Sequence, residues 1–110
     1  MKHQISLDLR VLLFQEDKTW VAQCLEWDIA AQGKTLDDAL NSFECIFVGQ
    51  IILDIENGRK PLESTPVAPK EYQKMFKDAR KLADKKPFSL PKEIRPVINT
   101  ATANDLRIAA

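Results

Sequence analysis

The alternation of apolar and polar residues near the start of the chain predicts a β-strand over residues 5–14. Every second side chain in its first part is apolar, at Ile5, Leu7, Leu9, Val11 and Leu13. A period of two is typical of a strand with one buried face. Residues 19–25 follow a short polar link and are rich in β-branched and aromatic side chains. The two runs therefore predict an antiparallel hairpin, and residues 29–32 predict a third, short strand.

A long helix is predicted to begin at Thr35 and to end at Glu56. Thr35 opens a capping box in which Asp38 stands where Glu is usual, and the acidic first turn suits the positive end of the helix dipole. A core-facing stripe recurs every three or four residues, at Leu36, Leu40, Phe43, Phe47 and Ile51. Gly58 supplies the left-handed residue that stops the helix.

The second half of this helix is apolar beyond its core-facing stripe. The additional apolar residues are Cys45, Ile46, Val48, Ile52 and Leu53. A helix that is apolar on most sides must be covered on most sides, which a three-stranded sheet cannot do alone. Either a second helix of the chain or a second copy of the chain covers it. We predict a homo-oligomer, a dimer or larger, with an interface formed by Ile46, Val48, Ile52 and Leu53.

Prolines punctuate the rest of the chain. Those within residues 59–69 predict a connector that can add at most an edge strand. Residues 70–86 have the apolar spacing of an amphipathic helix, and the prolines that follow predict an irregular tail. The sequence thus predicts an α+β fold: an antiparallel β-β-β-α sheet with one long helix on its face, then a C-terminal amphipathic helix and the tail. We assign residues 1–69 to the β-β-β-α domain and residues 70–110 to the basic helix and tail.

The charges of the chain cancel overall but are unevenly placed. Residues 1–58 hold four Lys/Arg and ten Asp/Glu, a net charge of −6, so the remainder carries +6. An acidic first half suits a basic protein partner. Seven basic residues fall within residues 70–86, where they form a solvated face or contact an acidic partner or nucleic-acid phosphate. The candidates for phosphate contact are Lys74, Lys77, Arg80 and Lys81.

No residue cluster indicates catalysis. The two cysteines, Cys24 and Cys45, lack the CxxC spacing and nearby histidines of a zinc site, so both are expected to be buried thiols, with a redox pair as the alternative. The one histidine is His3, and the three glycines form no phosphate-binding loop. We therefore predict a protein that is not an enzyme, with no catalytic residues, no metal site and no cofactor.

The chain shows no sign of membrane insertion or secretion. The longest apolar region, residues 43–55, is too short to span a membrane and contains Glu44, Gln50 and Asp54. The first apolar run is interrupted by Asp8, unlike the core of a secretory signal. We expect a cytoplasmic protein without a membrane segment.

Residues 5–66 resemble the small β-β-β-α domain of the bacterial HicB antitoxin family. The resemblance rests on the strand pair, on Gln32-Gly33-Lys34-Thr35 with Asp37-Asp38-Ala39-Leu40, similar to the family's QGxTxxEAL segment, and on Gly58 with Pro61-Leu62. Members of this family bind and neutralise a small basic ribonuclease toxin and assemble as dimers or larger. The resemblance implies a noncatalytic toxin-binding protein. An orphan oligomeric module with another partner, or a DNA-binding repressor that uses residues 70–86, is the alternative.

The turn after the second predicted strand is the candidate partner-binding site. Trp27 is a large rigid anchor there, flanked by Glu26 and Asp28 as an acidic rim for basic partner residues. The alternative is that Trp27 is a core aromatic. Because the HicB fold looks like a truncated ribonuclease H fold, Asp8, Glu26 and Asp28 could also be magnesium ligands of a nuclease. Their spacing does not indicate the convergence that such a site needs.

Overall fold

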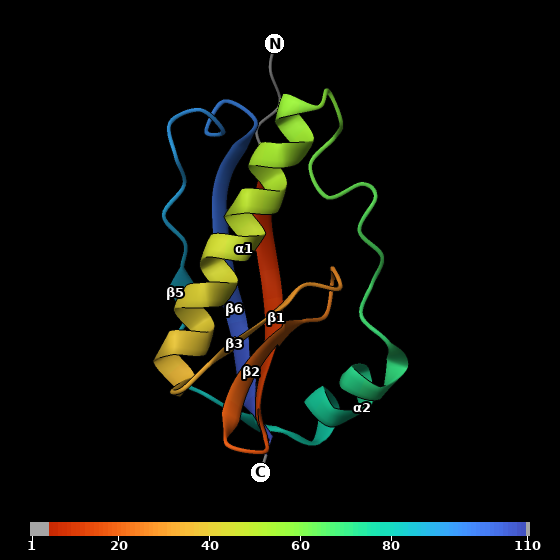
Figure 1. The fold of residues 1–110 in the computed structure, drawn as a ribbon, viewed down its shortest axis with the longest axis vertical. Helices are drawn as coiled ribbons and strands as arrows, with labels where there is room; N and C mark the ends of the chain where they lie inside the picture. Colours follow the sequence, from red (N-terminus) through yellow and green to blue (C-terminus); the bar gives the residue numbers. More distant parts are fainter. Residues whose placement is uncertain (1–4, 110) are drawn as a thin grey trace.

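Two helices and one mixed sheet of six strands make up residues 5–109, the part of the chain that the computed structural model describes (Figure 1). The strands are β1 (Ile5–Glu16), β2 (Thr19–Cys24), β3 (Ala30–Gly33), β4 (Arg80–Lys81), β5 (Lys86–Pro87) and β6 (Ile98–Ile108). The helices are α1 (Leu36–Glu56) and α2 (Lys70–Asp78). The strand order is β3-β2-β1-β6-β4, with β5 also paired to β6. The predicted α+β class is therefore confirmed.

The first half of the chain folds as its local signals predict. β1 and β2 form the antiparallel hairpin, with Val11 opposite Cys24 and Glu16 opposite Thr19, and β3 adds antiparallel to β2. The hairpin turn contains Asp17 at a positive φ of 57°, a conformation that aspartate tolerates better than most residues. β1 is buried on both faces in its middle, which explains why its alternation fails at Leu12.

α1 begins and ends at residues with clear local causes. The Thr35 side chain accepts a hydrogen bond of 3.1 Å from the Asp38 N–H, so Thr35 is the N-cap. Gly33 lets β3 approach the helix, because a Cβ there would lie 2.4 Å from the Ala39 nitrogen. At the other end Gly58 takes a positive φ of 70°, as its stop signal predicts.

The expectation of a wholly antiparallel sheet followed by an irregular tail is wrong. Residues Ile98–Ile108 form β6, which lies beside β1 in the middle of the sheet and runs parallel to it. The strand alternates weakly in sequence because Ala101 and Ala103, both fully buried, lie in the core where α1 covers the sheet. Residues on both sides of position 69 thus contribute to one sheet.

The basic helix is also shorter than predicted. α2 ends at Asp78, because Ala79 takes an extended ψ of 155° and the chain continues into β4. β4 then pairs antiparallel with β6, with Arg80 opposite Ile108. Tertiary pairing to β6 therefore replaces the second half of the expected helix.

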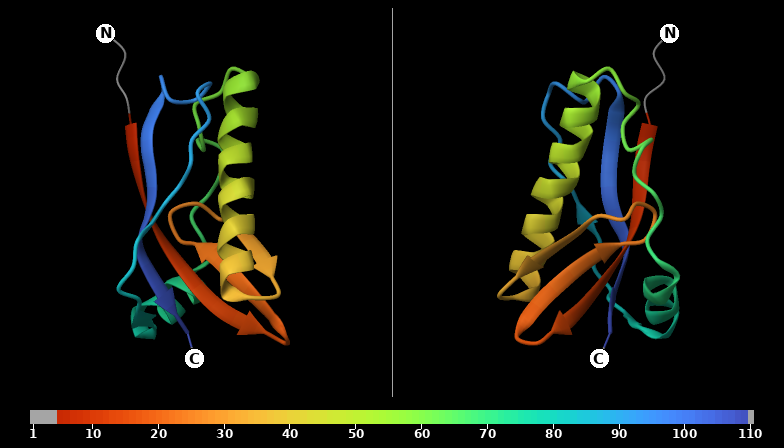
Figure 2. Two further views of the ribbon diagram at one scale, coloured as in Figure 1. Left: turned by 90° about the vertical axis from the view of Figure 1, so that its left-hand side faces the viewer. Right: turned by 45° about the vertical axis from the view of Figure 1, so that its right-hand side comes forward.

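The two helices cover opposite faces of the sheet (Figure 2). α1 packs on one face through Phe43, Phe47 and Ile51, and the segment before β6 closes its flank with Phe88. α2 covers only one end of the other face, where Phe76 joins a smaller apolar cluster: Leu12, Phe14, Val21, Leu25 and Ala68. Figure 2 shows no helix or strand over the side of α1 that faces away from the sheet.

Candidate partner-binding site

The turn that carries the predicted anchor, residues 25–29, is fixed by backbone hydrogen bonds on several sides. The Leu25 N–H donates to the Arg10 carbonyl oxygen on β1 (3.0 Å), and the Cys24 N–H donates to the Ile29 carbonyl oxygen across the turn (3.0 Å). The connector between the helices closes the third side, with the Asp28 N–H donating to the Pro66 carbonyl oxygen (2.7 Å) and the Ala68 N–H to that of Leu25 (3.1 Å). We call this segment the Trp27 turn.

Glu26 is engaged within the molecule. Its carboxylate accepts hydrogen bonds from the backbone N–H of Arg10 (2.8 Å) and from the Arg10 Nε (2.6 Å). Both donors belong to β1, so this pair ties the Trp27 turn to the sheet. Glu26 therefore positions the turn more than it offers charge to a partner.

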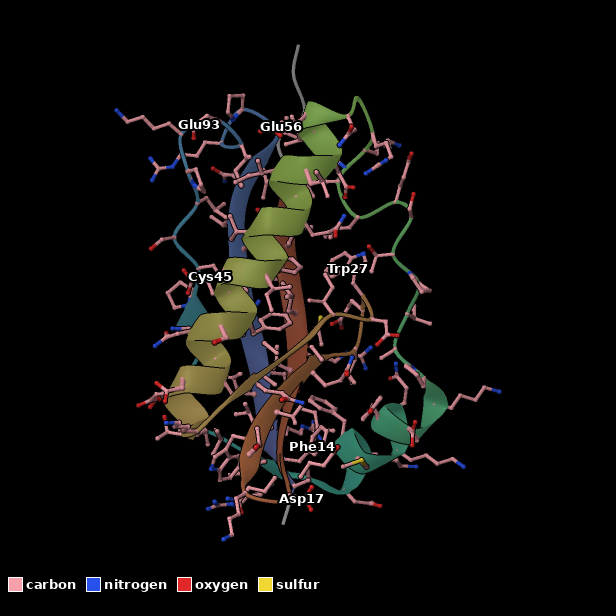
Figure 3. All side chains as sticks on the ribbon, in the orientation of Figure 1. Phe14, Asp17, Trp27, Cys45, Glu56 and Glu93 are labelled. Carbon is pink, nitrogen blue, oxygen red and sulfur yellow. The ribbon has the colours of Figure 1, made fainter. Side chains whose placement is uncertain are left out.

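Trp27 is half-buried beside α1 (Figure 3). Its ring centroid lies 5.8 Å from that of Phe47, with the planes tilted by 50°. An aromatic pair of this geometry is attractive beyond the apolar area it buries. The side chain thus combines a core contact with an accessible part, so the two interpretations of Trp27 are compatible.

Asp28 is the exposed carboxylate of the turn. Its Oδ1 accepts a hydrogen bond of 3.0 Å from Gln23 Nε2, which also donates to the Cys24 carbonyl oxygen at 2.9 Å. Gln23 is buried, with 3% of its surface exposed, so it is a firm support for the Asp28 side chain. Gln23 was not among the residues predicted for this site, and the one signal for it is an amide in a largely apolar strand.

The two cysteines lie in different environments. Cys24 is buried in the core, and burial is the main reason why its pKa rises to about 12. Such a thiol is protonated at neutral pH and is a poor nucleophile. Cys45 is exposed on α1, so the expectation of two buried thiols is wrong for this residue. Both are free thiols.

The carboxylates considered for magnesium each have a different partner. Asp8 accepts from the Asn104 side chain, Glu26 from Arg10, and Asp28 from Gln23. Within residues 5–109 no group of three or more His, Cys, Asp or Glu side chains is placed to hold a metal ion. His3 lies outside the described residues.

The four residues predicted for the oligomer interface do not share one environment. Ile46 and Leu53 are each 49% exposed. Ile52 is half-buried against the core, and Val48 is buried between α1 and the sheet. Only part of the predicted set therefore lies on open surface.

The four basic residues predicted for phosphate contact are all exposed. Lys74 and Lys77 lie on α2, while Arg80 and Lys81 lie on β4. Lys86, from the same basic run, is paired with Glu44 on α1 at 3.6 Å. An open cleft of about 460 Å³ lies next to Arg80 and is lined by Phe14, Gln15, Trp20, Met75, Asp78, Ala79, Ile108 and Ala109.

Comparisons with known proteins return no relative. No family model, no curated protein and no solved structure matches the chain. Among the described residues, neither helix has the length and apolar character required to cross a membrane.

Proposed function

We propose that this chain is a noncatalytic HicB-like protein of the antitoxin type, which binds and neutralises a small basic ribonuclease toxin. The observation that carries the proposal is the Trp27 turn, where an accessible indole and an exposed carboxylate are displayed on a backbone fixed by hydrogen bonds to β1 and to the connector. A preorganised turn loses little entropy on binding. Tryptophan is among the residues that contribute most to protein interfaces.

The motif residues behind the resemblance have structural roles that support it. Gly33 permits the close contact between β3 and the first turn of α1, and Thr35 caps that helix. The elements β1, β2, β3 and α1 follow one another in the order that the resemblance implies. These roles explain a QGxT segment at this place in a β-β-β-α domain.

Electrostatics favour a basic partner at the Trp27 turn. Asp28 is the carboxylate offered to solvent, since Glu26 is paired with Arg10. Residues 1–58, the half of the sequence to which the turn belongs, carry a net charge of −6. Complementary charge mainly accelerates association and selects the partner, and its effect weakens with salt.

Co-expression of this chain with its neighbouring genes, followed by purification and mass determination, tests the proposal. We expect a stoichiometric complex with a small basic protein that has ribonuclease activity when released. The variant Asp28→Asn keeps an oxygen that can accept the Gln23 hydrogen bond but removes the charge, so it should weaken the complex without unfolding the protein. Asp17→Asn removes the charge of another exposed carboxylate, on the hairpin turn, and is the matched control. Purification of the chain without any partner contradicts the proposal and favours an orphan module.

One observation favours DNA binding as a second candidate. Lys70, Lys74 and Lys77 recur on one side of α2, while its other side packs on the sheet through Tyr72 and Phe76. A short basic stripe of this kind can contact phosphates without reading bases. Binding to duplex DNA that weakens steeply with salt would support DNA binding, if Lys74→Gln and Lys77→Gln each reduce that salt dependence. Salt-independent or undetectable binding contradicts it.

A further inference from the structure

The open cleft of about 460 Å³ lies where the central strands of the sheet come to an end. β6 makes its last pair with β1 at Ile108, opposite Leu13, and the Ala109 N–H then donates to the Leu13 carbonyl oxygen at 2.9 Å. β1 runs on to Glu16, and α2, which contacts β1, ends at Asp78. The end of β6 therefore leaves an opening between β1 and the end of α2. Its volume is in the range of sites for small molecules, about 300–1,000 Å³.

The wall of the cleft is apolar and draws on both apolar clusters of the molecule. Phe14 belongs to the smaller cluster beside α2, where its ring stacks on Tyr72 with the centroids 5.8 Å apart (Figure 3). Trp20 packs against the main core, and Met75 packs against the smaller cluster. Aromatic rings and thioethers favour contact with another aromatic ring. Because these side chains are held by their clusters, the wall is in place before a ligand binds.

Arg80 brings an uncommitted positive charge to this apolar wall. In the pairing of β4 with β6 it lies opposite Ile108, so the two side chains are cross-strand neighbours. Arg10, Arg59 and Arg107 each pair with a carboxylate. Within residues 5–109 the guanidinium of Arg80 has no ion pair or hydrogen bond. A free guanidinium offers a planar set of N–H donors that matches a carboxylate.

Asp78 places a negative charge on the same rim. Ala79, between Asp78 and Arg80, is extended, with φ −81° and ψ 155°. Residues that flank an extended residue lie about 7 Å apart at Cα and direct their side chains to the same side of the chain. Both side chains are exposed, both line the cleft, and in the described part of the chain they form no ion pair with each other. The rim thus offers one carboxylate and one guanidinium, close together and unpaired.

This combination of groups selects the chemistry of the ligand. A nucleic-acid strand presents only phosphates, one of which would lie beside the Asp78 carboxylate. An uncharged apolar molecule would remove water from Arg80 and Asp78 without replacing their hydrogen bonds. A molecule that carries an ammonium group and a carboxylate on one carbon atom, with an aromatic ring attached, matches every part of the cleft. The α-amino acids with aromatic side chains have this structure.

We propose that the cleft binds a free aromatic α-amino acid. The carboxylate of the ligand pairs with Arg80, its ammonium group pairs with Asp78, and its ring lies against the aromatic and thioether wall. The described residues that line the cleft include none from the Trp27 turn. The proposal therefore does not rest on toxin binding.

Nuclear magnetic resonance of the isotope-labelled full chain, titrated with L-phenylalanine, locates and measures the binding. We expect shifts of the backbone amide signals of Gln15, Ala79 and Ala109, which line the cleft. The expected Kd is at or below about 1 mM for a ligand of this size. The amide signals of the Trp27 turn should not move. No shifts up to about 10 mM ligand, or shifts centred on another part of the molecule, overturn the proposal.

Matched ligands test the two charges separately. Phenethylamine lacks the carboxylate and hydrocinnamate lacks the ammonium group. Each should bind at least about fivefold more weakly than L-phenylalanine, because one charged hydrogen-bonding group of the rim is left without a partner. Either compound binding as tightly as L-phenylalanine overturns the assignment of both charges to the rim.

Two variants at exposed positions connect each charge to its residue. Arg80→Gln should weaken L-phenylalanine and hydrocinnamate at least about fivefold and should not weaken phenethylamine. Asp78→Asn should weaken L-phenylalanine and phenethylamine and should not weaken hydrocinnamate. Lys81→Gln and Asp84→Asn are the matched controls, since they remove exposed charges of the same sign that do not line the cleft. Equal affinity of L-phenylalanine for the wild type and both cleft variants, or an equal loss in the controls, overturns the proposal.

Discussion

Replacement of Gly33 by alanine tests the contact that joins β3 to α1. The added Cβ would lie 2.4 Å from the Ala39 nitrogen and 2.7 Å from the Asp38 carbonyl carbon, both of them backbone atoms. Backbone cannot rotate away as a side chain can. The Cβ must therefore retreat by roughly 0.6 Å to reach the 3.0 Å limit of real contacts, which moves either the end of β3 or the first turn of α1.

The cost of that movement follows from what it disturbs. Forcing an extra methyl into a packed interior costs about 1–3 kcal/mol. The same displacement strains the Thr35 cap, whose hydrogen bond to Asp38 is already 3.1 Å, and loss of an N-cap costs about 1 kcal/mol. We expect Gly33→Ala to lower the free energy of unfolding by about 2–4 kcal/mol, a large part of the total stability of a domain of this size.

Urea unfolding followed by tryptophan fluorescence measures the effect, since Trp20 and Trp27 report on the sheet. The expected loss lowers the midpoint by about 1–2 M if the slope is about 2 kcal/mol per M. Gly49→Ala is the control, because its Cβ meets nothing within 4 Å, and in dilute solution it should stabilise the chain by about 0.5–1 kcal/mol. Equal effects of the two substitutions, or a neutral Gly33→Ala, would refute the packing argument.

Three other outcomes are expected. Asp54→Ala should destabilise the protein by about 1–3 kcal/mol in urea unfolding at neutral pH, because it leaves the buried Leu62 N–H without its acceptor. The hydrogen bond from the Leu62 N–H is also the main reason why the pKa of Asp54 is lowered from 3.8. The ionised carboxylate therefore contributes stability above pH 3.8 that is lost as the pH falls further. A difference in the free energy of unfolding between wild type and Asp54→Asn that stays constant across that range would contradict this. A thiol reagent should modify Cys45 in the dilute native protein and reach Cys24 only on unfolding, and rapid modification of both thiols would show that Cys24 is accessible.

The elements with local causes could be predicted from the sequence. Thr35 and Gly58 mark the ends of α1 by side-chain capping and by a positive φ, which depend on few neighbours. The hairpin of β1 and β2 follows from two adjacent runs joined by a short turn. These signals lie within a few residues of the structure that they specify.

β6 could not be predicted because its cause is remote. The strand pairs with β1 from the opposite end of the chain, with Ile5 beside Ile98 and Leu13 beside Ile108. Its buried side chains include Ala101 and Ala103, which lie in the main core but give no strong apolar period in the sequence. A remote cause also explains why α2 is shorter than predicted. The chain after α2 forms β4, which pairs with β6.

The candidate site could be predicted in part. The turn between β2 and β3 and its exposed Asp28 follow from the sequence pattern, because turn residues lie at the surface. The contacts of Glu26 with Arg10 and of Asp28 with Gln23 depend on the register in which the strands pair. The sequence pattern of β1 alone does not define this register, because the middle of the strand is buried on both faces. The Phe47 contact of Trp27 depends likewise on where α1 lies across the sheet.

The most direct test of the central proposal is the mass and composition of the complex that this chain forms when it is expressed with its neighbouring genes. We expect a small basic protein in stoichiometric amount, held in a complex that Asp28→Asn weakens and Asp17→Asn does not. Recovery of the chain alone, or of a complex equally stable in both variants, would contradict the assignment of partner binding to the Trp27 turn.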